Sequence, residues 1–185
     1  QVVGFSTPLV NAGAQDFQGL QADMSYGIRV ADIPLVNRLL RPGADYGSLN
    51  FDINAFYEDQ HSFTILGVTT PTRGNIGDPK FRLNATTRYR KGPLGLYFQA
   101  RHVSSGQADV TLQRSSQQIY GVGDYWVFNS SVSYDITNRI TAQLVMNNLF
   151  DIDPPQYAIT LSTGNALSTY DYFGQSFVMS LKLKL

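Results

Sequence analysis

The chain has 185 residues, with 14 basic and 14 acidic side chains and no cysteine. This balance of charge gives no strong field to attract nucleic acid, and the lack of thiols excludes both a disulfide framework and a thiolate metal site. Charged residues make up only 15% of the chain, against about a quarter in soluble domains, while Tyr and Phe number 11 each. Such a composition fits an antiparallel β protein, including a barrel whose outer face contacts lipid.

Seven segments alternate between apolar and polar residues, which is typical of strands with one apolar face. In chain order they cover residues 20–29, 49–57, 81–90, 94–101, 125–135, 140–147 and 176–185. The clearest is "YWVFNSSVSYD". One face of this segment carries Trp126, Phe128, Val132 and Tyr134, and the other carries Val127, Asn129, Ser131, Ser133 and Asp135. We therefore predict an all-β, antiparallel fold.

The connections between these segments alternate in length. Tight turns are predicted at 91–93 and 135–138, whereas long polar loops are predicted at 58–79, 104–123 and 150–173. Outer-membrane barrels have this arrangement, with short periplasmic turns and long external loops. One connection on the short-turn side is long, and its "IPLVNRLL" predicts a turn or two of helix. The sequence favours a transmembrane barrel over a soluble sandwich.

Aromatic residues end several of the apolar runs. Trp126 and Tyr134 are on one face and eight residues apart, which spans roughly 20 Å along the barrel normal for a strand tilted by about 40°. The lipid-facing band of an outer-membrane barrel is about 25 Å tall and has an aromatic girdle at each edge. We expect a lipid-interface girdle formed by Tyr26, Tyr57, Tyr89, Trp126 and Tyr134.

The last fifty residues resemble the closing strands of a TonB-dependent outer-membrane receptor. The similar segments are "VMNNLFDIDPP" and "YDYFGQSFVMSLKLKL", and weaker likeness extends upstream through "KGPLGLYFQARHVSSG" and "LVNAGAQDFQGLQADMSY". The residues that match the family motif are Asn148, Leu149, Phe150, Asp151, Pro154, Pro155, Tyr170, Asp171 and Gly174. Gln175 stands where the family usually has Arg.

The resemblance implies a larger molecule. Such receptors close about 22 strands around a plug, so we expect residues 1–185 to be the carboxyl-terminal portion of the barrel, with seven or eight of its strands and without the plug. It also implies active uptake of a scarce nutrient, of the ferric siderophore, cobalamin or saccharide class, across the bacterial outer membrane. The expected partners are outer-membrane lipid, the amino-terminal remainder of the barrel with its plug, TonB, and a small-molecule substrate; no cofactor or nucleic acid is expected.

Two other classes of protein stay open at this point. One is a small, self-closed outer-membrane barrel of eight strands, with residues 2–9 as the eighth, that acts as an adhesin or anchor. The other is a soluble β-sandwich that binds carbohydrate. Either would have a different function from a transporter.

The sequence contains no catalytic constellation, so we do not expect an enzyme. His61 and His102 have no cysteine and no second histidine at metal-ligand spacing, so we also expect no metal site. The glycine-rich turns "GVGDY" and "GNIGDP" have no following helix and therefore do not predict a phosphate cradle.

Arginines on the polar faces are the clearest candidates for ligand binding. Arg82 and Arg101 fall nearest the long loops and are expected to attract an anionic substrate, whereas Arg88 and Arg90 fall near the short turn and suit contact with a plug. The alternative for all four is pairing with acidic residues of neighbouring strands. Aromatic candidates for stacking on a ligand, or simply for loop packing, are His61, Phe63, Tyr120, Tyr125, Tyr157, Tyr170 and Tyr172.

Overall fold

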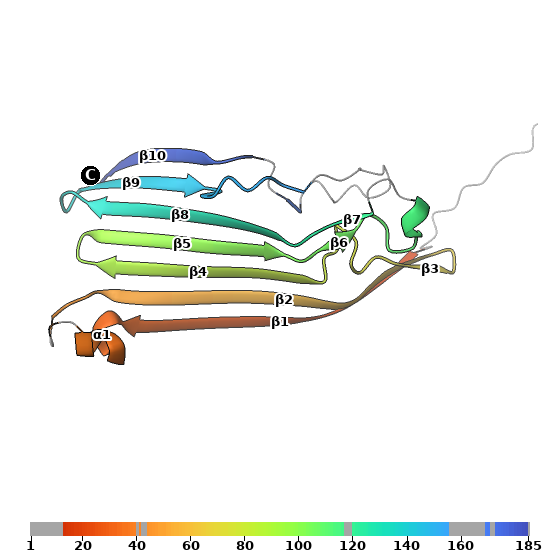
Figure 1. The fold of residues 1–185 in the computed structure, drawn as a ribbon, viewed down its shortest axis with the longest axis horizontal. Helices are drawn as coiled ribbons and strands as arrows, with labels where there is room; N and C mark the ends of the chain where they lie inside the picture. Colours follow the sequence, from red (N-terminus) through yellow and green to blue (C-terminus); the bar gives the residue numbers. More distant parts are fainter. Residues whose placement is uncertain are drawn as a thin grey trace, which may run out of the picture.

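The computed structural model describes residues 13–39, 41, 44–116, 120–155, 169–170 and 173–184. Its main feature is one antiparallel sheet with the strand order β1-β2-β4-β5-β8-β9-β10 (Figure 1). The strands of this path are β1 (Gly13–Arg29), β2 (Ser48–Ile65), β4 (Phe81–Lys91), β5 (Leu94–Val103), β8 (Tyr125–Asp135), β9 (Ile140–Asn147) and β10 (Ser176–Leu183). All seven predicted strands are confirmed, and each pairs with its neighbours along the chain as in a meander.

Helical structure is slight. The segment expected to turn into a helix forms η1 (Val30–Asp32) and α1 (Pro34–Leu39), and a further 3-10 turn, η2, covers Arg114–Ser116. Within the described ranges, no helix is both long and apolar enough to cross a membrane.

Short and long connections lie at opposite ends of the sheet. The β4–β5 and β8–β9 turns lie at the same end as α1, while β3 (Val68–Pro71), β6 (Gly106–Gln107) and β7 (Gly121–Val122) lie at the other end (Figure 1). The tight β4–β5 turn contains Gly92, whose φ of +51° is left-handed and costs glycine little. The predicted alternation of short turns and long loops is therefore confirmed.

The first long loop was predicted wrongly in part. Residues 58–65 continue β2 beyond Tyr57, and β3 folds back on them as a hairpin in which Ile65 pairs with Val68. The cause is a β-bulge: Gly19 pairs with Glu58 while Gln18 pairs with Gln60, so Asp59 is an extra residue on β2. A bulge shifts the side-chain alternation by one residue, which hides the strand from a search for period two.

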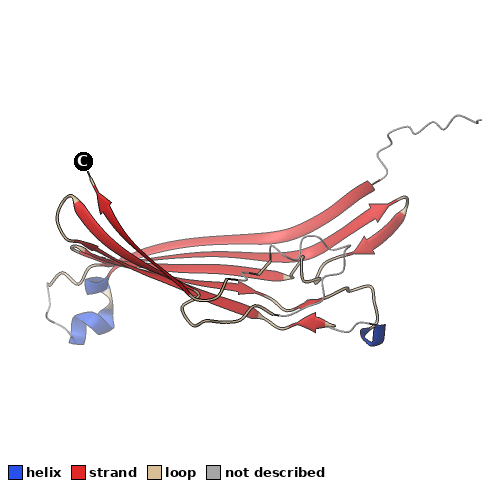
Figure 2. Ribbon diagram, turned by 90° about the horizontal axis from the view of Figure 1, so that it is seen from above, coloured by secondary structure: helices blue, strands red, loops and turns tan. Residues whose placement is uncertain are grey.

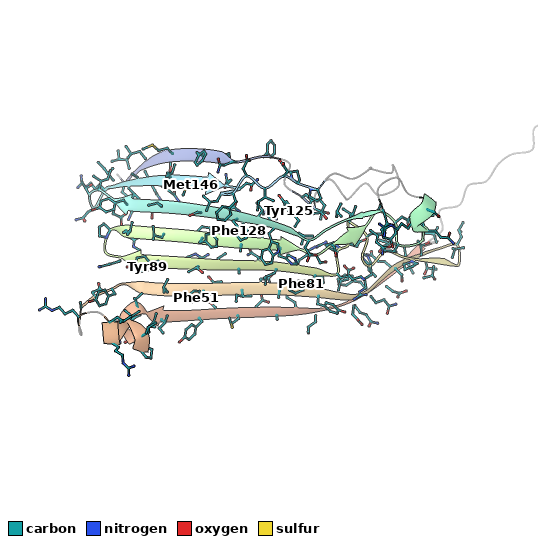
Figure 3. The ribbon with its side chains drawn as sticks, viewed as in Figure 1. Phe51, Phe81, Tyr89, Tyr125, Phe128 and Met146 are labelled. Carbon is teal, nitrogen blue, oxygen red and sulfur yellow. The ribbon has the colours of Figure 1, made fainter. Side chains whose placement is uncertain are left out.

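The sheet has one apolar and one polar face. Cross-strand neighbours on the apolar face include Ile53, Ala85, Ala100 and Phe128 in one row, and Leu49, Tyr89, Leu96, Val132 and Leu144 in another. Many of these side chains are open to the surroundings; Leu96 is 40% exposed and Leu144 38%. Phe51, Tyr89, Phe128 and Met146 belong to β2, β4, β8 and β9 and are spread across the sheet in Figure 3. A soluble protein would bury such a face.

The sheet is a single curved layer (Figure 2). β1 and β10 lie at its two opposite edges and do not pair with each other, so the described strands do not close into a barrel. Nor does a second large sheet pack across them in the part of the chain that the structure describes. The lack of a second sheet in the described residues disagrees with the β-sandwich. Residues 2–9, the proposed eighth strand of a small barrel, lie outside the described residues.

The buried core lies at the long-loop end. Ile76, Tyr125, Val127 and Tyr170 form a hydrophobic cluster. Ile76 belongs to the loop 72–80, which pairs with the β6–β7 hairpin through its Asn75–Gln107 bridge. We call residues 72–80, 104–110 and 120–124 the loop layer; it covers the polar-face residues Tyr125 and Val127 of β8.

Candidate functional site

The polar face is organised by hydrogen-bonded side chains that cross the strands. Gln99 Nε2 donates to Asn84 Oδ1 at 2.7 Å, and Asn129 Nδ2 donates to Gln99 Oε1 at 2.9 Å, so one amide ladder links β4, β5 and β8. A groove of about 620 Å³ runs along this face. It is lined mainly by amides, hydroxyls and arginines, which makes it a surface for a hydrated or polar partner.

Two of the four candidate arginines form ion pairs on this face. Arg88 pairs with Asp52, which also accepts a hydrogen bond from Ser25 Oγ at 2.6 Å. Arg90 pairs with Asp135, which accepts a second bond from Thr141 Oγ1 at 2.7 Å. Both arginines thus form ion pairs with carboxylates of other strands, which was the alternative to their expected contact with a plug.

The other two arginines meet at one pocket near the loop layer. Arg82 and Arg101, together with Asn54, Asn84 and Tyr125, line a cavity of about 190 Å³. Arg82 donates to the carbonyl oxygen of Gly77 at 3.2 Å. Arg101 forms no salt bridge within the described residues.

A second pocket opens within the loop layer itself. It has a volume of about 520 Å³ and is lined in part by Lys80, Arg114 and Tyr120. The guanidinium of Arg114 lies over the Tyr120 ring, 5.3 Å from its centroid. The sequence predicts Tyr120 as a candidate here but neither Lys80 nor Arg114, because charged loop residues are too common to stand out without their spatial neighbours.

The remaining aromatic candidates fall into different environments. Tyr125 and Tyr170 are buried in the core, with ring centroids 5.2 Å apart in an edge-to-face contact. His61 and Phe63 lie on β2 rather than on a loop, with ring centroids 5.2 Å apart. Tyr157 and Tyr172 lie outside the described residues.

His61 belongs to a buried polar cluster that was not predicted. Its Nδ1 lies 2.8 Å from Glu58 Oε1 and 3.4 Å from Asp78 Oδ1. Glu58 follows Tyr57, beyond the last residue of the apolar run of β2, and burial raises the pKa of its carboxyl. The signal in the sequence is Glu58-Asp59-Gln60-His61, but residues three apart on a regular strand face opposite sides. Without the bulge this spacing predicts no shared site.

Comparison with known proteins decides the family. The sequence model described as TonB dependent receptor-like, β-barrel matches residues 1–149. The chain belongs to the TonB-dependent receptor β-barrel family. Its members are outer-membrane transport receptors rather than enzymes, which agrees with the expected lack of a catalytic centre. No curated protein matches the chain.

Among solved structures, the chain is similar to the ferric-catecholate import receptor Fiu from E. coli K12 in its closed form. The identity is 16% and the TM-score 0.41, over 76% of this chain and 22% of that one. The chain thus spans about a fifth of the length of that receptor.

The first residues of the segment that resembles the TonB-dependent receptor motif, 148–151, form a tight turn after β9. Asn148 and Asp151 have φ values of +47° and +51°, a region that Asn and Asp tolerate better than most residues. Asn148 Nδ2 donates to Ile152 O at 3.0 Å and its Oδ1 accepts from Ile152 N at 2.9 Å. Asn148 and Asp151 therefore have a structural explanation in closing this turn.

The same turn is bonded to the approach to β10. Gln175 N donates to Asp151 Oδ1 at 2.9 Å, and Gln175 Nε2 donates to Leu149 O at 2.8 Å. Gly174 lies close by, since an added Cβ would be 3.3 Å from Asp151 Oδ1. Gln175 thus serves as a donor where this receptor family usually has Arg. Phe150 packs against Phe128, and Asp171 lies outside the described residues.

The girdle candidates of this receptor barrel fall at two levels of the apolar face. Tyr57 and Trp126 lie toward the loop layer, and Trp126 packs against His102 with ring centroids 4.4 Å apart. Tyr26, Tyr89 and Tyr134 lie toward the short turns, and Tyr89 donates its hydroxyl to Tyr46 O at 2.8 Å. Rings at these heights suit the two interfaces of a bilayer.

Proposed function

We propose that this chain is the carboxyl-terminal portion of a larger outer-membrane barrel that takes up a scarce nutrient and is energised through TonB. The observation that carries the proposal is the two-faced sheet: an exposed apolar face for lipid and a polar face for a lumen. Its open edges support a larger barrel, because unpaired strand edges are not tolerated in hydrocarbon. The remaining strands, about 15 for a barrel of 22, and a plug would come from the rest of the protein.

The nutrient is proposed to bind at the long-loop end, toward the outside. Arg101 is the candidate with the most available charge, and Arg82 lines the same cavity. Lys80 and Arg114 bring further positive charge to the loop-layer pocket. This charge favours an anionic substrate, of which a ferric siderophore is the best fit among the ferric siderophore, cobalamin and saccharide classes.

The test is uptake by the full-length protein in a Gram-negative host that lacks its own receptors. Cells would be offered a labelled ferric-catecholate complex, cyanocobalamin or a maltodextrin, with and without a functional TonB. We expect the ferric complex to accumulate only with TonB. The same uptake without TonB, or no uptake of any of the three, would contradict the proposal.

Two arginines in different surroundings, Arg101 and Arg88, give a variant of the binding site and its matched control. We expect Arg101→Ala to lower uptake severalfold, whereas Arg88→Ala removes an arginine that is already paired with Asp52 and changes uptake little. Equal loss in both variants would indicate that Arg101 acts through assembly and not through the substrate.

A further inference from the structure

The cluster of Glu58, His61 and Asp78 has the donor atoms of a metal site. One oxygen from each carboxylate and a ring nitrogen of the histidine all lie within 4.8 Å of one another. Glu58 is 3% exposed and His61 8%. Buried carboxylates are costly unless a cation or hydrogen bonds compensate them, so this arrangement calls for a positive partner.

The bulge at Asp59 creates the shared face. On an unbroken strand Glu58 and His61 would point to opposite sides of the sheet, whereas the extra residue returns His61 to the side of Glu58. Bulges often re-aim side chains next to functional sites. Asp59 itself is exposed.

The contact between Glu58 and His61 is short. Glu58 Oε1 and His61 Nδ1 are 2.8 Å apart, and neither buried atom has a well-aligned hydrogen-bond partner among the described residues. Two ligands of one tetrahedral metal ion are about 3.4 Å apart, since each bond is about 2.1 Å. Asp78 Oδ1 lies 3.4 Å from Nδ1, which matches that separation, and Glu58 Oε1 is closer, at 2.8 Å.

The other side of the imidazole is held in place. His61 Nε2 lies 2.6 Å from Gln15 Nε2, and a half-turn of the Gln15 amide brings its oxygen to the same place. Phe17 approaches the ring edge-on at 5.4 Å between centroids. When the amide presents its oxygen, it accepts the Nε2 proton and leaves the Nδ1 lone pair toward the carboxylates, as outer partners of metal-bound histidines do.

The loop that carries Asp78 is anchored to the same two residues. Glu58 N donates to Lys80 O at 2.9 Å, and Thr72 N donates to His61 O at 3.0 Å. Asp78 is therefore presented by a segment whose two ends are fixed on Glu58 and His61, so little ordering is left for an ion to impose.

We propose that Glu58, His61 and Asp78 bind one divalent first-row transition-metal ion, of which Zn²⁺ best suits two carboxylates and an imidazole. The two carboxylates balance its charge. Because the site is buried, the ion is a resident one that holds the loop 72–80 against β2 at the long-loop end of the sheet. It is separate from the transported nutrient.

The experiment uses the full-length protein, purified in detergent, stripped with EDTA and titrated with ZnCl₂. We expect one Zn²⁺ per chain at this site and a higher melting temperature, and Co²⁺ in its place should give a visible d–d spectrum. Asp78→Asn and His61→Gln, which keep shape, should weaken the binding at least about tenfold. Asp59→Asn, an exposed carboxylate next to the site, is the control and should bind as wild type does.

Three results would overturn the proposal. The first is a wild type that binds no Zn²⁺ and gives no Co²⁺ spectrum. The second is a loss of binding in Asp59→Asn as large as that in Asp78→Asn. The third is binding of Ca²⁺ but not Zn²⁺, abolished by Asp78→Asn. The comparison of stripped and Zn²⁺-loaded wild type needs no variant, so a folding defect in a variant does not hide the answer.

Discussion

The side-chain oxygen of Asn129 accepts a hydrogen bond from the backbone N–H of Asn148 at 2.9 Å. Asn129 is also the last member of the amide ladder across β4, β5 and β8. The turn that resembles the family motif is therefore bonded both to the polar face of the sheet and to the approach to β10. Asparagine suits position 148 because its side chain bonds Ile152 and because it tolerates a left-handed backbone.

Replacing Asn148 should destabilise the turn in two separable ways. Asn148→Ala removes both side-chain bonds to Ile152 and forces alanine into φ +47°, for a combined loss of about 2–4 kcal/mol in the free energy of unfolding. Asn148→Gly removes the same bonds without the backbone strain and should lose less. Urea unfolding of the full-length protein in detergent measures both, and an Asn148→Ala variant as stable as wild type would refute this account of the turn.

Gly47 and Gly67 provide a matched pair for backbone crowding. Their φ values are +81° and +82°, but a Cβ on Gly47 would be 2.2 Å from Arg90 O, whereas nothing lies within 4 Å of one on Gly67. Gly67→Ala should cost only the strain of a left-handed alanine, about 1 kcal/mol. Gly47→Ala should displace the start of β2 and reduce the folded fraction further. The folded fraction is measured on a gel, as the band of unboiled protein that shifts on boiling. Equal effects of the two variants on this band would contradict the close approach of residue 47 to Arg90 O.

The pair of Arg88 and Asp52 should respond to exchange of its charges. Arg88→Glu places two carboxylates together on the polar face and should lower the midpoint of urea unfolding. The double variant Asp52→Arg/Arg88→Glu should recover part of that loss, because opposite charges face each other again. Both side chains are well exposed, so the recovery should shrink at high salt. A double variant no better than Arg88→Glu would show that the two residues do not interact.

The strands could be predicted because each is a local pattern. The apolar face from Trp126 to Tyr134 is visible in the sequence, and pairing simply places such faces side by side. The continuation of β2 could not be predicted in this way, because Asp59 shifts the alternation. Val127 was placed on the polar face correctly, but its burial depends on Ile76, which arrives from a distant loop.

The candidate site was less predictable than the fold. Arg82 and Arg101 were expected to act together, and the register of β4 and β5 brings them to one cavity. The grouping of Glu58 and His61 with Asp78 depends on a bulge and on a loop folding back across β2. Spacing in the sequence encodes neither event directly.

The most direct test of the account is a lysine on each face of β8. Val132 faces Leu96 and Leu144, while its neighbour Ser131 faces Tyr97 and Val145 on the polar side. If the apolar face contacts lipid, Val132→Lys should lower the stability of the assembled barrel by about 2–4 kcal/mol. It should sharply reduce the amount of full-length protein in the outer membrane that migrates differently on a gel before and after boiling. Ser131→Lys should assemble nearly as wild type does. Assembly of Val132→Lys as complete as that of Ser131→Lys would contradict lipid contact and, with it, the transmembrane barrel.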